Sequence, residues 1–295
     1  MRRQRTLIGI GWMVLTGLLF VAVTGIVRHL GSNLPAVEAA FIRYAFGLVL
    51  VLPVLLRVGS RIPRGRAMTL CIARGVVHGG GVMLWFFAMA RIPIAEVTAI
   101  GYTAPIFTTL GAAFFLGERL RARRVGAMIA GFIGVIVILR PGFQTMQLGS
   151  LAQLTAAPLF AVSFLLAKKL TETESPAMIV AMLSIFCTIT LLPGALLQWR
   201  APTGVELSWL FLTAVFATAG HYTLTRAFEA APITVTQPVS FLQLVWAMLL
   251  GMLLFGERVD AWILLGGAII VGAATYISHR EAMAARRSLA KPTAD

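Results

Sequence analysis

The stretch PIAEVTAIGYTAPIFTTLGAAFFLGER, residues 93–119, returns 139 residues later as PITVTQPVSFLQLVWAMLLGMLLFGER, residues 232–258. The two stretches align without a gap, and both open with Pro-Ile and close with Gly-Glu-Arg. Each encloses an apolar run long enough to cross a bilayer. Because internal repetition dictates the architecture of a chain, the sequence predicts two copies of one membrane unit.

The composition excludes an ordinary water-soluble domain. Of the 295 residues, 59% are hydrophobic and 12% are charged, and the mean hydropathy is +0.88. The charged share is about half of that in a typical soluble domain. Ten apolar stretches approach or reach the length of a membrane span: 6–28, 35–56, 67–90, 93–116, 124–140, 149–168, 176–197, 207–230, 232–255 and 260–279. They divide into five and five, which places the two repeats at 1–143 and 144–295.

Basic residues are distributed unequally between the two sides of these spans. With the N-terminus inside, the inner segments hold 17 Lys and Arg and the outer segments hold 5, while Arg43, Arg74 and Arg226 lie within spans. This asymmetry follows the positive-inside rule. It predicts a multi-pass protein of the bacterial inner membrane with both termini cytoplasmic, and it accounts for the net charge of +14 without a nucleic-acid partner.

The odd number of spans in each half decides how the repeats are related. After five crossings the second copy enters the membrane from the opposite side. The expected fold is therefore an all-α integral membrane protein with ten transmembrane helices in two inverted five-helix repeats. Inverted repeats are typical of secondary transporters, whose halves rock around a central site.

The second span adds Phe41-Ile42-Arg43 to the two repeated stretches. On these residues, and on a tandem layout that covers essentially the whole chain, the protein resembles the EamA-type ten-helix group of the drug/metabolite transporter superfamily. The resemblance implies a basket-like helical fold with a central cavity lined mostly by spans three, four, eight and nine. It also implies export of small organic metabolites, often amino acids or toxic compounds.

Ionisable groups inside a bilayer are costly and are functional candidates by default. His78 and His221 lie in repeat-equivalent spans, and Tyr102 and Phe241 occupy matching positions of the repeated stretch. An aromatic cavity with a few amide or hydroxyl groups suits an amphipathic ligand. The predicted substrate-binding residues are His78, Trp85, Tyr102, His221, Tyr222, Gln237, Phe241, Gln243 and Trp246.

Each of these residues also has a purely structural interpretation. A buried histidine can hold helices together, an aromatic ring in a span often packs against lipid, and Gly-Glu-Arg can be a helix cap. Arg43 is a candidate for an ion pair with Glu38 or Glu96. Arg226 is placed to pair with Glu229, three residues further along the chain.

The sequence has no phosphate-binding loop and no catalytic metal or nucleophile motif. We therefore expect a protein that is not an enzyme and has no cofactor, with a small-molecule substrate and the lipid bilayer as partners. The leading prediction is a secondary transporter that exports amino acids or aromatic or toxic amphipathic compounds. The alternatives are an importer of a vitamin or nucleoside-like compound, or an intramembrane enzyme that modifies lipid. The oligomeric state stays open, a monomer included.

Proton coupling has few candidate carriers in this sequence. Glu96 is the one carboxylate at moderate depth in a predicted span. His78 and His221 are the other candidates, because an unperturbed imidazole has a pKa of about 6.5. Facilitated export or exchange is therefore favoured over proton-driven transport.

Overall fold

The structure, a computed structural model, describes residues 2–58, 62–104, 107, 122–140, 147–231, 236, 239–240, 242–258 and 260–289. Four features singled out in the sequence lie outside these residues: the first Gly-Glu-Arg at 117–119, Pro232-Ile233, Gln237 and Phe241.

All regular structure within the described residues is helical. The helices are α1 (Arg2–Leu30), α2 (Ala36–Val58), α3 (Arg66–Met89), α4 (Ile94–Gly101), α6 (Ala122–Leu139), α7 (Leu148–Leu170), α8 (Pro176–Leu197), α9 (Gly204–Ala230), α11 (Leu242–Phe255) and α12 (Ala261–Leu289).

Six of the described helices are long and apolar enough to cross a membrane: α1, α2, α3, α7, α8 and α9. The described parts of α6, α11 and α12 contain shorter apolar segments of 10–17 residues. Many large apolar side chains on these helices are exposed, Leu56, Leu196 and Leu253 among them. This distribution suits a protein whose outer surface meets lipid, because hydrocarbon chains solvate such side chains.

Local sequence explains where several helices begin. Ser175 caps α8 by accepting a hydrogen bond from the backbone N–H of Met178, and Pro176 occupies the first turn, where its missing N–H costs nothing. Thr203 and Glu206 form a reciprocal capping box at the start of α9. At the other end of a helix, Gly31 takes φ 63° just after α1, a conformation that glycine adopts without strain.

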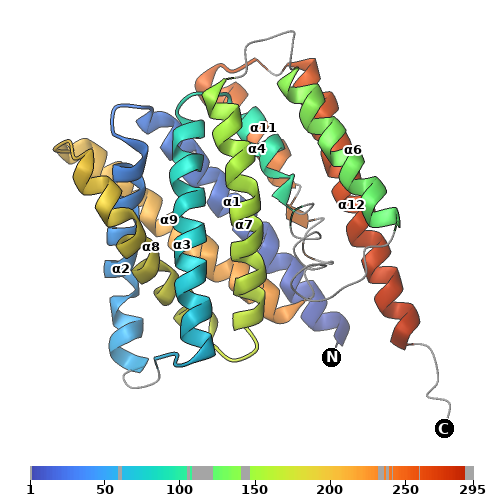
Figure 1. Ribbon diagram of the computed structural model, residues 1–295, viewed down its shortest axis with the longest axis horizontal. Coiled ribbons are helices and arrows are strands. Elements are labelled where there is room, and N and C mark those ends of the chain that lie inside the picture. Colours follow the sequence, from blue (N-terminus) through green and yellow to red (C-terminus); the bar gives the residue numbers. More distant parts are fainter. Residues whose placement is uncertain are drawn as a thin grey trace.

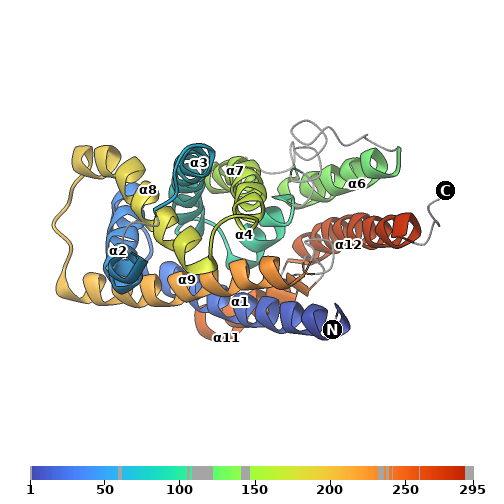
Figure 2. The same cartoon turned by 90° about the horizontal axis from the view of Figure 1, so that it is seen from below.

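The helices pack in antiparallel pairs that are far apart in the sequence (Figure 1). The chief pairs are α1 with α9, α3 with α7, α2 with α8, and α6 with α12. The backbones of α6 and α12 are in close contact at two glycines. A β-carbon placed on Gly134 would lie only 2.7 Å from the carbonyl oxygen of Gly266. Small residues at helix interfaces allow such approach in membranes. Seen from below, α6 and α12 lie at one side of the bundle and α2 and α8 at the other (Figure 2).

Candidate functional site

A cavity of about 240 Å³ lies in the middle of the bundle. Its walls come from α1, α2, α3, α4, α7, α9 and the start of α11. Most of the lining is apolar or aromatic, with the polar groups of Thr16, Arg43, His78, Gln153, His221 and Gln243 among the rings. A concave, mainly apolar site with a few converging polar groups is the ordinary form of a small-molecule site.

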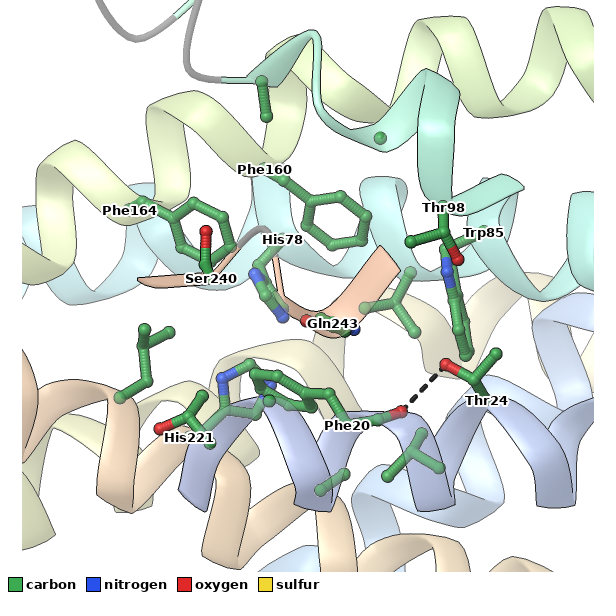
Figure 3. A pocket seen from close by; sticks show the side chains of 18 of the residues that line it. Phe20, Thr24, His78, Trp85, Thr98, Phe160, Phe164, His221, Ser240 and Gln243 are labelled. Atoms are coloured by element: carbon green, nitrogen blue, oxygen red, sulfur yellow. Dashed lines mark hydrogen bonds between the residues drawn. The ribbon is translucent and has the colours of Figure 1, made fainter. Parts of the chain in front are cut away.

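Four rings cross the cavity in an edge-to-face series. Phe20 of α1 lies 5.2 Å from His221 of α9, His221 lies 4.9 Å from His78 of α3, and His78 lies 5.2 Å from Phe160 of α7, measured between ring centroids. Figure 3 shows the two imidazoles between the two phenyl rings. The order phenylalanine, histidine, histidine, phenylalanine reads the same from either end, and each half of the chain supplies one phenylalanine and one histidine.

Two glycines make room for these phenyl rings. A β-carbon at Gly220 would meet Cε1 of Phe20 at 2.9 Å, and one at Gly81 would meet Cε1 of Phe160 at 3.2 Å. Gly81 and Gly220 are 139 residues apart, the same spacing as the repeated stretch. Each glycine therefore admits the ring that lies edge-on to a central histidine.

Several buried polar atoms at the cavity have no hydrogen-bond partner among the described residues: Nε2 of His78, Nδ1 of His221 and Oε1 of Gln153. His78 is held from its other side, because its Nδ1 lies 2.8 Å from Oγ of Ser163 in α7. The two histidines are 2% and 6% exposed. Unpaired polar atoms at this depth are costly, which makes them suited to hydrogen bonding with a bound molecule.

Arg43 of α2 also lines the cavity, and it is only 4% exposed. Its guanidinium lies 3.8 Å from the centroid of the Tyr44 ring. The expected ion pair with Glu38 or Glu96 is not formed, so this prediction was wrong. Oε2 of Glu38 accepts from the backbone N–H of Arg200 at 2.9 Å, and Oε1 of Glu96 accepts from Oγ of Ser150 at 2.6 Å. These oxygens bind donors other than Arg43, and Oε1 of Glu38 is buried without a hydrogen-bond partner among the described residues.

Arg74, one helical turn before His78, is a second buried guanidinium. Its Nη1 donates to the carbonyl oxygen of Ile179 at 3.2 Å, while Nε and Nη2 have no partner among the described residues.

The pairing predicted for Arg226 is confirmed, because its Nη1 lies 3.1 Å from Oε2 of Glu229 at the protein surface.

The structure brings five of the predicted substrate-binding residues to the cavity: His78, Trp85, Tyr102, His221 and Gln243. Tyr102 also donates from its hydroxyl to the carbonyl oxygen of Ser240 at 2.7 Å, which joins α4 to the approach to α11. Tyr222 is 39% exposed and is not part of the described lining, because its neighbour His221 occupies the inward face of α9. Trp246 packs against Gly17 of α1 and is likewise not part of that lining.

Sequence reasoning missed the contributions of α1, α2 and α7. Thr16, Phe20 and Thr24 come from α1, and Phe160 and Phe164 come from α7. The hydroxyl of Thr24 donates a hydrogen bond from Oγ1 to the carbonyl oxygen of Phe20 at 2.8 Å, and this bond orients the Thr24 side chain (Figure 3). The available signal was the repeat itself, since Phe20 and Phe160 lie 140 residues apart in equivalent spans.

One ion pair ties α1 to three other segments. Nη2 of Arg28 lies 2.9 Å from Oε1 of Glu257, and Nη1 of Arg28 donates to the carbonyl oxygens of Met89 and Ile92. Oε2 of Glu257 accepts from the backbone N–H of Ile94 at 2.9 Å. The second Gly-Glu-Arg therefore supplies more than a helix cap: its glutamate joins the end of α11 to α1 and to the start of α4.

Comparison with known proteins places this geometry in a family. The model of the EamA-like transporter family matches residues 7–140 and again residues 147–279. A riboflavin transporter of Rhizobium johnstonii is 33% identical over 285 residues, which cover 94% of this chain and 93% of that protein. An S-adenosylmethionine uptake transporter of Rickettsia bellii is 28% identical, with 96% and 97% covered. A pseudopaline exporter of Pseudomonas aeruginosa is 25% identical, with 92% and 96% covered.

A solved crystal structure shares the fold, with a TM-score of 0.61 at 20% identity, and the match covers 99% of this chain and 100% of the other. The family model covers both halves of the sequence, and the relatives that match over nearly their whole length are named as transporters of small molecules. This multi-pass, helical membrane protein belongs to the EamA-like transporter family.

Proposed function

We propose that this protein is a secondary transporter that carries a planar heteroaromatic metabolite across the bacterial inner membrane, with riboflavin uptake as its activity. The observation that carries the proposal is the central cavity, where aromatic side chains of Phe20, Trp85, Phe160 and Phe164 line the walls together with two unpaired imidazole nitrogens, Nε2 of His78 and Nδ1 of His221. Aromatic walls bind flat rings through stacking and edge-to-face contacts. The polar atoms supply the directional contacts that fix the ring's orientation.

Of two relatives whose names state a direction, the S-adenosylmethionine uptake transporter at 28% identity is more similar to this chain than the pseudopaline exporter at 25%, which supports uptake over the export that the sequence placed first. Riboflavin transporters of Rhizobium johnstonii and Vibrio cholerae are 33% and 31% identical to this chain. S-adenosylmethionine, which carries a planar adenine ring, is the second candidate substrate because an uptake transporter for it matches 96% of the chain. Export is the second candidate direction, favoured by the pseudopaline exporter at 25% identity.

For the mechanism we propose ten spans in two inverted repeats, residues 1–143 and 144–295, which rock around the cavity. The packing supports this arrangement, because α1 lies antiparallel on α9 as α7 does on α3. The ring pairs Phe20–His221 and Phe160–His78 have equal separations of 5.2 Å. A pseudo-two-fold axis in the membrane plane would exchange the two halves, as in other transporters with inverted repeats.

The proposed orientation has both termini in the cytoplasm. The start of α1 and the end of α12 lie towards the same end of the bundle (Figure 1), and the excess of basic residues sets that end inside. A reporter that is active only in the periplasm, fused after residue 295, should stay silent. Strong activity of this fusion would contradict the ten-span arrangement.

The transport proposal is tested in a bacterial strain that requires riboflavin and lacks its own riboflavin transporter. Expression of this chain should restore growth at low riboflavin and accumulate labelled riboflavin, whereas labelled S-adenosylmethionine should not accumulate. Trp85→Ala should lower riboflavin uptake by about tenfold, the effect of losing one aromatic contact to the substrate in the cavity. Trp262→Ala, at an exposed position at the start of α12, is the matched control and should transport normally. Failure of the unaltered protein to accumulate riboflavin, despite normal abundance in the membrane, would refute the proposal.

A further inference from the structure

The guanidinium of Arg43 has no counter-charge within the described residues. Arg43 is 4% exposed, lines the cavity and makes no hydrogen bond or ion pair to any described group. Its guanidinium lies 3.8 Å from the centroid of the Tyr44 ring. The attraction of a cation to an aromatic face is weaker than the free-energy cost of burying a charge away from water.

The surroundings of Arg43 do not neutralise it. No aspartate or glutamate belongs to the described lining of the cavity. Arg74 adds a second buried guanidinium, and two of its nitrogens lack partners among the described residues. Neither Glu38 nor Glu96 pairs with Arg43: Oε2 of Glu38 accepts from the backbone of Arg200 and Oε1 of Glu96 accepts from Ser150, while Oε1 of Glu38 has no partner among the described residues. The described part of the cavity therefore carries a net positive charge beside its aromatic walls.

We propose that Arg43 is the charge-selecting group of the transport site: it binds an oxygen-rich, neutral or anionic edge of the substrate and excludes cations. This inference rests on the transport function proposed above and deepens it by naming the substrate class. Gln153, whose Oε1 lacks a described partner in the same cavity, supplies an acceptor for a ring N–H. A pyrimidinedione edge, with two carbonyl oxygens flanking an N–H, offers both kinds of group.

This selection distinguishes the two candidate substrates. The isoalloxazine ring of riboflavin is uncharged and ends in such a dione edge. S-adenosylmethionine carries a sulfonium and an ammonium against one carboxylate, so its net charge is positive. Opposite charges within about 4 Å attract, and like charges repel by a similar energy, with several-fold greater strength in a site shielded from water.

The test uses three probes with one ring system and different charges: 2-naphthylacetate, 2-naphthylacetamide and 2-(2-naphthyl)ethylammonium. Thermal unfolding of the purified protein in detergent reports binding, since a ligand raises Tm by mass action. We expect the anion to bind about tenfold more tightly than the ammonium probe, with the amide between them. Arg43→Gln should abolish this order, and Arg43→Lys should keep it because the charge remains. Arg226→Gln changes an exposed arginine paired with Glu229 and serves as the control that keeps the order.

The inference is overturned if the unaltered protein binds the ammonium probe as tightly as the anion, or if Arg43→Gln preserves the order. The first comparison needs no variant, so it holds even if Arg43→Gln fails to fold. Because binding is measured with naphthalene probes, absence of riboflavin uptake would refute the proposed function while leaving the role of Arg43 to be decided by this experiment.

Discussion

The imidazole rings of His78 and His221 meet edge to face, with their centroids 4.9 Å apart and their planes at 74°. The two residues come from α3 and α9, which occupy equivalent places in the two halves of the chain. Each ring lies 5.2 Å from a phenylalanine of another helix. The contact therefore joins both halves of the sequence at the cavity.

Loss of either imidazole should impair transport more than folding. Nε2 of His78 and Nδ1 of His221 have no described partner, so we expect these atoms to contact the substrate. His78→Ala and His221→Ala should each lower uptake by about tenfold, the value of one hydrogen bond in a buried site. Tyr222→Ala, which removes the exposed neighbour of His221, should leave uptake unchanged. An equal loss of uptake in all three variants would contradict the prediction that the two histidines contact the substrate.

The glycines that seat the phenyl rings should be sensitive to a single added methyl group. Gly220→Ala places a β-carbon 2.9 Å from Phe20, which forces that ring away from His221. We expect reduced uptake with normal abundance in the membrane, measured by labelled-substrate accumulation and immunoblotting. Gly126→Ala, where a β-carbon meets nothing within 4 Å, should transport normally. A Gly220→Ala protein with unchanged uptake would argue that the position of Phe20 does not matter.

The ion pair between Arg28 and Glu257 should contribute to thermal stability. Their side chains are 23% and 10% exposed, and together they bind three backbone groups. Glu257→Gln should cost about 1–3 kcal/mol, since the partly buried guanidinium of Arg28 loses its counter-charge, and Tm in detergent should fall by several degrees. Glu172→Gln breaks the exposed pair with Lys169 and should change Tm little, because exposed pairs contribute about 0–1 kcal/mol. Equal shifts in both variants would contradict the prediction.

Solute flux should respond little to a pH gradient. No carboxylate belongs to the described lining of the cavity, and Glu96 is engaged by Ser150, so the usual proton carrier of coupled transporters is missing from that lining. In proteoliposomes with the membrane voltage clamped, an imposed pH gradient should leave uptake nearly unchanged, and Glu96→Gln should behave like the unaltered protein. A strong stimulation that disappears in His221→Gln would instead make that histidine the proton carrier.

The helical membrane class, the repetition and the family were all predictable from the amino-acid sequence. These features depend on local quantities: the length of apolar runs, the position of charges at their ends and the spacing between the copies of one phrase. A span must satisfy its own backbone hydrogen bonds in lipid, so its existence follows from composition without knowledge of its neighbours. His78 and His221 were selected on the same basis, because an ionisable residue inside a span is rare enough to be noticed.

Which helix faces pack against one another became clear only from the folded arrangement of the helices. Positions that face lipid and positions that face an aromatic cavity are both apolar, so hydrophobic periodicity does not separate Phe20 and Phe160 from rings on the outer surface. The same ambiguity placed Tyr222 among the predicted contacts, although helix α9 turns it outward. The position of Arg43 was the least predictable from the sequence. Glu38, five residues earlier, was a predicted ion-pair partner, but in the folded protein Oε2 of Glu38 accepts from the backbone N–H of Arg200, and Arg43 lines the cavity.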